Sequence, residues 1–268
     1  MTKVRTPTPS EVEKLRLILS TYQDGTGMWA QKDGSTLPGW RDFERAVALA
    51  LGGEAQESKA IFDVLLPTNK PSVKYGLSCK MRGELNRIDR DGRVTLELSN
   101  SAGKFWDYLR TKGIHQRNYK KYPIEVGIAL IELVEQWHQE VSVEQGGNVG
   151  LTGSSYLALS WNKAGWYQLH QFPLRFPNPQ RLKWYFPAST KKGNRTTARR
   201  LSGNDSSGTL FEWYGESGGQ LKYYPLAKTA IWSSERFRLE PLRNVEHGIL
   251  AKVAAYFPDL WTAANKDS

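Results

Sequence analysis

Asp63, Lys80 and Glu97 are the residues of this chain whose types and spacing are best suited to chemistry. Each belongs to a short apolar run, at residues 60–66, 74–80 and 93–98. A carboxylate inside an apolar strand is costly to bury unless a cation or a hydrogen-bond donor satisfies it. Two carboxylates and a lysine on neighbouring strands could bind Mg²⁺ beside a phosphate. That arrangement is typical of a metal-dependent nuclease.

Helical patterns surround these three runs. Ser10 and Glu13 form a capping-box pattern that predicts a helix to about Tyr22. Apolar residues at helical spacing predict further helices at residues 40–51, 104–109 and 123–139. The three apolar runs have the length and composition of strands. The first part of the chain therefore predicts a mixed α/β (α+β) fold in which helices flank a mixed sheet.

The second part has a different character. Strand-like aromatic segments follow one another from residue 156 to residue 224, and a last helix is expected at about residues 245–256. We expect a helical segment with a catalytic core at residues 1–145 and a β-rich, basic half at residues 146–268. The second half could also be continuous with the first in one domain.

The order of these elements resembles the core of the PD-(D/E)XK nucleases, and especially of type II restriction endonucleases. The resemblance covers about residues 40–112, where Asp63 matches the aspartate of the family and Lys80 its lysine. It implies a restriction-endonuclease-like sheet and Mg²⁺ as the cofactor. Glu44 is a plausible match to the acid that members often carry on a preceding helix, as an outer support of the metal site.

One position departs from the family pattern, because Ser78 stands where a second carboxylate is usual. A subgroup that cuts CCGG-type sites has a similar Ser-x-Lys and takes its acid from further along the chain. Glu97 is the best candidate for that second metal ligand, and Glu84, in an expected turn, is the alternative. Ser78 itself is expected to pack beside the metal ligands or to support them.

Non-catalytic interpretations of these residues stay open. An isolated aspartate in a strand is often a hydrogen-bonded structural acid, and Lys80 could end a strand with its amine in solvent. Glu44 could be an ordinary solvated side chain of a helix. If the catalytic interpretation is right, Lys80 would hold the attacking water or stabilise the charge of the transition state.

The basic residues are concentrated in two acid-free stretches. The net charge is +10, and residues 145–204 and 108–124 carry fourteen of the 37 Lys and Arg residues but no Asp or Glu. Without them the chain would be slightly acidic, so a polyanion partner is indicated. The residues that we expect to contact double-stranded DNA are Lys191, Lys192, Asn194, Arg195, Arg199, Arg200, Arg117 and Lys120.

Cysteine usage and hydropathy limit the kinds of metal site, cross-link and membrane association that the chain can have. Cys79 is the single cysteine, which excludes an intrachain disulfide framework and a Cys-rich zinc site. No apolar run is long enough to cross a membrane, and the start of the chain lacks the pattern of a signal peptide. We expect a cytoplasmic protein with no membrane partner and no small-molecule cofactor.

The sequence thus favours a Mg²⁺-dependent type II restriction endonuclease that cuts double-stranded DNA at a specific site. The resemblance implies a homodimer, for which the helix at 123–139 is a possible surface unless it belongs to the core. The alternatives are a structure-selective or repair nuclease with the same core, and a non-catalytic DNA-binding module.

Overall fold

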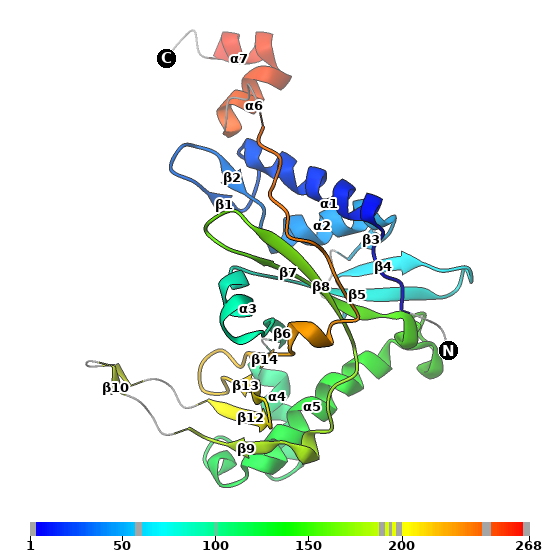
Figure 1. The fold of residues 1–268 in the computed structure, drawn as a ribbon, viewed down its shortest axis with the longest axis vertical. Coiled ribbons are helices and arrows are strands. Elements are labelled where there is room, and N and C mark those ends of the chain that lie inside the picture. The colour runs from blue at the N-terminus through cyan, green and yellow to red at the C-terminus, as the bar shows by residue number, and fades with distance from the viewer. Residues whose placement is uncertain are drawn as a thin grey trace.

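The computed structural model describes residues 4–56, 61–99, 101–187, 200–242 and 248–264, and the backbone alone of 191–192 and 195–196. Figure 1 shows two sheets, with the larger one in the upper half of the view and a second one below it. The long helix α5 (Pro123–Glu140) runs beside both sheets. The fold can therefore be described as two sheets that share one helix.

The larger sheet has six strands in the order β15-β8-β7-β5-β4-β3. Their bounds are β3 Glu54–Ala55, β4 Val64–Pro67, β5 Lys74–Arg82, β7 Ser155–Trp161, β8 Tyr167–Pro173 and β15 Trp232–Ser233. β5 and β7 are parallel, and the other neighbours are antiparallel. A parallel pair requires a crossover connection, and the long segment between β5 and β7, which contains α5, provides it.

Side chains on β5 alternate between the two faces of this sheet. Leu77 and Cys79 are buried in a core formed with α1 (Pro9–Thr21) and α2 (Trp40–Leu51). The opposite face of the sheet contributes Tyr156 and Phe172 to a second core, which α5 covers. Ser78 and Lys80 are out of phase with Leu77 and Cys79, so they belong to the face that α5 covers.

The first two helices largely follow the sequence pattern. α1 begins two residues earlier than expected, because Thr8 and Glu11 form the capping box in place of Ser10 and Glu13. The Glu11 amide donates to Thr8 Oγ1 at 3.2 Å, and the Thr8 amide donates to Glu11 Oε2 at 2.9 Å. α2 ends at Leu51, as predicted, and Gly52, whose φ is 69°, provides a glycine cap.

The second sheet has five antiparallel strands in the order β6-β14-β13-β12-β9. Their bounds are β6 Leu96–Ser99, β9 Lys183–Tyr185, β12 Leu201–Asp205, β13 Gly208–Trp213 and β14 Leu221–Tyr223. The expectation that residues 93–98 form a third strand beside the first two was wrong. β6 pairs with β14, and its Leu96 is fully buried in the core shared with α5.

The segment just before β6 explains this change of sheet. The residues expected to form a turn contain α3 (Leu85–Asp91), which leads the chain away from the edge of β5. The place beside β5 is taken by β7, whose residues are all buried except Trp161 at its end. Such a continuous buried strand suits the interior of a sheet covered on both faces.

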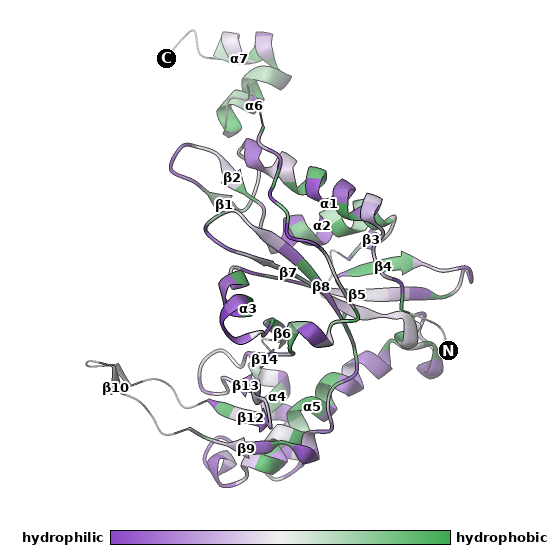
Figure 2. Ribbon diagram, viewed as in Figure 1, coloured by the Kyte–Doolittle hydropathy of each residue, from purple (hydrophilic) through white to green (hydrophobic). Residues whose placement is uncertain are grey.

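The described residues contain several further elements. These are β1 (Trp29–Ala30) and β2 (Thr36–Leu37), β10 (Lys191–Lys192) and β11 (Arg195–Thr196), α4 (Ala102–Thr111), α6 (Ile249–Tyr256) and α7 (Pro258–Ala264), and 3-10 turns at Tyr22–Asp24, Tyr119–Lys121, Val143–Gln145, Leu151–Gly153, Pro179–Arg181 and Ala227–Thr229. In Figure 2 the hydrophobic colour extends onto α6 and α7, which project from the body and contain no buried residue.

The predicted fold class, mixed α/β with a mixed sheet flanked by helices and a β-rich second half, is confirmed. Strands from both sides of residue 145 share both large sheets, since β5 pairs with β7 and β6 pairs with β14. None of the helices in the described ranges combines the length and apolarity that crossing a bilayer requires.

Candidate active site

Asp63 and Lys80 are in direct contact on neighbouring strands. Asp63 immediately precedes β4, and its Oδ2 lies 3.2 Å from Nζ of Lys80 on β5. Side-chain exposures of 23% for Asp63 and 20% for Lys80 leave both ions within reach of solvent. The structure therefore brings together the two residues that define the predicted site.

The backbone of β5 fixes the position of the Asp63 carboxylate. The main-chain amide of Cys79 donates to Asp63 Oδ2 at 2.7 Å, and the Asp63 amide donates to the Leu77 carbonyl at 2.9 Å. The hydroxyl of Ser78 lies 3.4 Å from the same Oδ2. These contacts all use Oδ2 and hold this oxygen against the backbone of β5. Cys79 is buried, and burial raises the pKa of its thiol.

Glu44, on α2, adds a second carboxylate to this site. Its side chain is buried, and Nη1 of Arg41 lies 3.4 Å from its Oε2. Burial, together with the negative charge of Asp63, raises the pKa of Glu44 to about 7 against the opposing charges of Arg41 and Lys80. The charges of Asp63 and Lys80 both act on the Glu44 carboxyl, so α2 contributes an acid to the surroundings of this pair.

Glu97 belongs to a different cluster. It lies on β6, where it is opposite Lys222 of β14, and its carboxylate forms an ion pair with Arg82 at the end of β5. The expectation that Glu97 lies on a strand next to Asp63 and Lys80 was therefore wrong. Strand pairing decides this, since β6 is hydrogen-bonded into the second sheet.

Glu84, the alternative to Glu97, also has other partners. Its carboxylate accepts a hydrogen bond from Thr95 Oγ1, and Nη1 of Arg87 lies 3.7 Å from Oε2. Glu84 is the residue that precedes α3 rather than part of an extended turn. In the described residues, both acids are thus engaged with groups outside the Asp63–Lys80 pair.

The donor set around Asp63 bears on the expected Mg²⁺. Among the described residues, no group of three or more His, Cys, Asp or Glu side chains is placed to bind a metal. Mg²⁺ sites in phosphoryl-transfer enzymes often use only one or two carboxylates, together with waters and substrate phosphates. Asp63 and Glu44 fit such a site, and they would hold the ion without Glu97.

Some of the basic residues expected to bind DNA lie outside the described residues, and others form ion pairs within the protein. The side chains of Lys191, Lys192 and Arg195, and the whole of Asn194 and Arg199, lie outside the described residues. The backbones of β10 and β11 form an antiparallel hairpin. Arg200 forms an ion pair with Glu212 on β13, and Lys120 forms one with Glu216.

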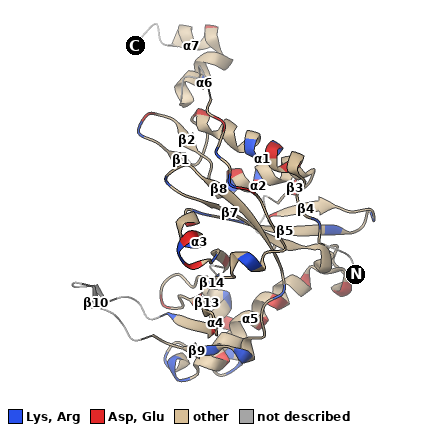
Figure 3. Ribbon diagram, viewed as in Figure 1, with Lys and Arg blue, Asp and Glu red and all other residues tan. Residues whose placement is uncertain are grey.

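Arg117 lies at a small basic hollow. The hollow has a volume of about 360 Å³ and is lined by Trp106, Arg110, His115, Gln116 and Arg117. Figure 3 shows further Lys and Arg residues at this lower end of the molecule, near β9. The arrangement provides several positive charges on one part of the surface.

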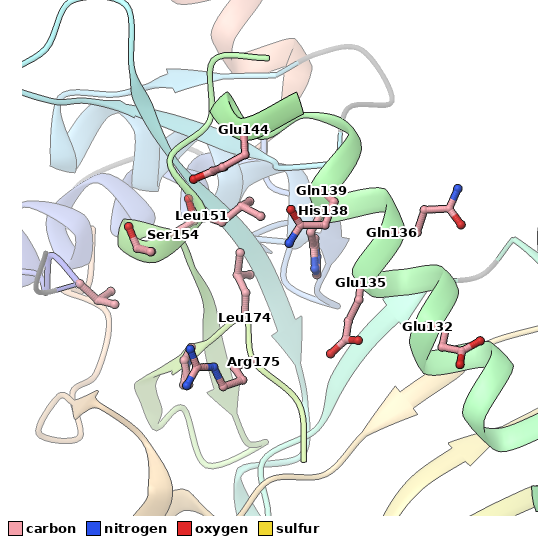
Figure 4. Close-up of a pocket in the computed structure, with 13 residues that line it drawn as sticks. Glu132, Glu135, Gln136, His138, Gln139, Glu144, Leu151, Ser154, Leu174 and Arg175 are labelled. Atoms are coloured by element: carbon pink, nitrogen blue, oxygen red, sulfur yellow. The ribbon is translucent and has the colours of Figure 1, made fainter. Parts of the chain in front are cut away.

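His138 is the main feature of the site region that sequence reasoning did not single out. Burial, together with the positive charge of Lys80, lowers the pKa of its imidazole to about 4. In Figure 4, His138 and Glu135 extend from α5 into a cavity of about 890 Å³, across from Arg175. Its only signal in the sequence was its place on the expected 123–139 helix, which is too weak to suggest a role.

Comparisons of this chain with protein-family models, with curated proteins and with solved structures each found no match. The geometry of the site therefore carries the functional argument.

Proposed function

We propose that this protein is a Mg²⁺-dependent, type II restriction endonuclease-like enzyme that hydrolyses phosphodiester bonds of double-stranded DNA. The observation that carries the proposal is the 3.2 Å contact between Asp63 and Lys80, with the buried Glu44 coupled to both charges. A partly exposed carboxylate–lysine pair with a second acid of raised pKa combines a metal-binding group, a cation for a phosphate and a group that can exchange a proton.

Each residue has a distinct part in this proposal. When bound, Mg²⁺ would supply a Lewis acid that lowers the pKa of a coordinated water and offsets the charge of the phosphate. Asp63 and Glu44 would hold the ion. Lys80, oriented by Asp63, would donate hydrogen bonds to the attacking water or to the phosphate oxygens as negative charge develops on them. Ser78 and the Cys79 amide would keep the Asp63 carboxylate in place.

Binding of DNA is attributed to the basic stretches. Residues 108–124 contribute Arg117 and Lys120, and residues 188–200 contribute the basic segment that ends at Arg200. We also propose that the protein acts as a homodimer on a two-fold symmetric site. Most apolar residues of α5 from Val126 to Val134 are buried in the core, which supports the alternative that this helix belongs to the core.

Digestion of a sequenced plasmid with and without Mg²⁺ tests the proposed function, and mapping of the ends identifies the cut site. We expect Lys80→Ala to abolish cleavage while DNA affinity stays within a few-fold, since Lys80 provides only one of many phosphate contacts. Turnover at the wild-type level by folded Lys80→Ala protein would refute the catalytic role of Lys80. A lack of Mg²⁺-dependent cleavage by the wild type on any duplex would favour a DNA-binding module.

A further inference from the structure

His138 lies near the end of α5 and contacts Phe62, the residue before Asp63. Its side chain is 7% exposed, and its ring is stacked on Phe62, with ring centres 5.7 Å apart and planes inclined by 18°. On its other sides it contacts Phe176, at 6.4 Å between ring centres, and Tyr156, whose hydroxyl lies 3.3 Å from Nε2. The imidazole is thus fixed by three aromatic neighbours.

Phe62 connects this ring to the proposed active site. It directly precedes Asp63 and is 2% exposed. Its ring covers Gly76 of β5 so closely that a Cβ on Gly76 would lie 2.3 Å from Phe62 Cγ. The Phe62 ring therefore packs between the backbone of β5 and the His138 imidazole. Because Phe62 and Asp63 are consecutive, a shift of the Phe62 backbone also shifts Asp63.

Tyr156 connects the same imidazole to β5 by a second route. In the parallel pairing of β5 with β7, Tyr156 is the partner of Ser78 and Ala158 is the partner of Lys80. Tyr156 is 2% exposed, so its ring cannot move without repacking the core. The His138 ring therefore contacts residues next to Asp63 in the chain and next to Ser78 in the sheet.

We propose that His138 is a positioning residue, which acts by stacking on Phe62 to hold the Asp63 carboxylate against Lys80 and the Cys79 amide. This inference rests on the proposed function for its effect on cleavage, but its structural part does not. The stack contributes through its shape, so an aromatic ring without a proton to exchange should replace it.

The chain offers a matched control in His170 on β8. His170 is also buried, at 2% exposure, is stacked on a phenylalanine, Phe172, with ring centres 6.4 Å apart, and has its pKa lowered to about 4 by burial. Replacement of either histidine removes a buried imidazole from the same sheet region. Only His138 contacts the residue that precedes Asp63.

The experiment compares His138→Ala, His138→Gln, His138→Phe and His170→Ala without metal, using hydrogen exchange of the Cys79 amide, which donates to Asp63 at 2.7 Å. We expect exchange at Cys79 to rise by about tenfold or more in His138→Ala and His138→Gln, because the acceptor moves away. Exchange should be near the wild-type rate in His138→Phe and His170→Ala. His138→Gln provides the test if His138→Ala does not fold.

Cleavage assays provide the second readout. We expect kcat of His138→Gln to fall about 10- to 100-fold with KM for DNA changed little, because a misplaced catalytic group lowers the rate of the chemical step. His138→Phe should restore most of the loss. Equal protection of Cys79 in His138→Gln and His170→Ala, or no rescue by His138→Phe, would overturn the proposal. Absence of cleavage by the wild type, with the expected exchange pattern, would instead refute the proposed function alone.

Discussion

Asp63 takes the place of a main-chain acceptor where β4 and β5 begin to pair. Its carboxylate receives the Cys79 amide at 2.7 Å, while its own amide donates to the Leu77 carbonyl. A hydrogen bond from a backbone amide to a carboxylate is charge-assisted and stronger than a neutral one. The pairing of β4 with β5 thus orients the Asp63 carboxylate before any ligand binds.

Substitution of the acids tests which of them completes the site. Glu44 is coupled to Asp63 and Lys80, whereas Glu97 is paired with Arg82 in the other sheet. We expect Glu44→Gln to reduce Mg²⁺-dependent cleavage by about 100-fold or more, since a two-carboxylate site loses half of its anionic ligands. Glu97→Ala should be the milder change. Steady-state cleavage rates at saturating Mg²⁺ measure the activity of both variants. A larger loss of activity in Glu97→Ala than in Glu44→Gln would instead indicate Glu97 as the metal ligand.

The raised pKa of Glu44 also predicts a pH dependence of stability. Folding raises this pKa from 4.5 to about 7, so between these values the folded state binds a proton that the unfolded state has lost. The contribution of Glu44 to stability is therefore complete below pH 4.5 and is lost as pH rises through about 7.

Urea unfolding of metal-free wild type and Glu44→Gln between pH 5 and pH 8 measures this contribution. We expect the variant to gain stability relative to the wild type as pH rises, by no more than about 3 kcal/mol. Parallel stability curves across this range would show that Glu44 does not titrate as the structure indicates.

At the scale of elements, the close approach of Phe62 to β5 is the feature that aligns β4 with β5. Gly76 leaves room for the Phe62 ring, and β4 and β5 then pair from Val64 opposite Leu77 to Pro67 opposite Lys74. A side chain at position 76 would occupy the space of that ring. The site therefore depends on a glycine that has no chemical role of its own.

Gly76→Ala should destabilise the protein by about 1–3 kcal/mol, because the Phe62 ring must move in a packed core. We also expect lower cleavage activity, since Phe62 is bonded to Asp63. Gly103→Ala is the matched control: a Cβ there has no neighbour within 4 Å, and Gly103 lies in α4. The control should be neutral or stabilising by up to about 1 kcal/mol. Thermal unfolding measures the stability of both variants. A Gly76→Ala protein as stable as the wild type would contradict the packing of Phe62 against Gly76.

At the scale of the whole molecule, one group of basic residues, around Arg117, lies apart from the proposed catalytic pair. Figure 3 shows basic residues around the lower end, while Asp63 and Lys80 lie in the upper sheet. Electrostatic binding of DNA depends on the number of phosphates contacted and not on their distance from the scissile bond. The proposed enzyme thus has a broad binding surface and a compact reacting site.

Simultaneous replacement of Lys191, Lys192, Arg199 and Arg200 by Ala should weaken DNA binding and flatten its salt dependence. Each lost phosphate contact lowers the slope of log K against log salt by about 0.9. Titrations of duplex DNA at several salt concentrations give this slope. Lys14→Ala, an exposed change on α1, is the control and should leave the slope unaltered. An unchanged slope in the fourfold variant would place the DNA elsewhere.

The sequence alone predicted the local features of this protein. The lengths and apolar content of the runs around Asp63 and Lys80 indicated two strands, and the spacing from Trp40 to Leu51 indicated α2 with Glu44 on it. α2 has its predicted bounds and β5 runs two residues past its predicted end, whereas β4 covers only Val64–Pro67, so Asp63 lies just before it. Local patterns suffice for this because backbone preferences and the period of buried side chains depend on nearby residues.

Only the tertiary structure decided which distant segments meet. Glu97 resembled a residue of a third neighbouring strand, but β6 joined β14, about 120 residues further along the chain. The sequence placed His138 only on an expected helix, whereas the packing of α5 in the structure stacks its ring on Phe62. Strand partners and helix packing are selected by the burial of whole surfaces that are far apart in sequence, and no local pattern encodes that choice.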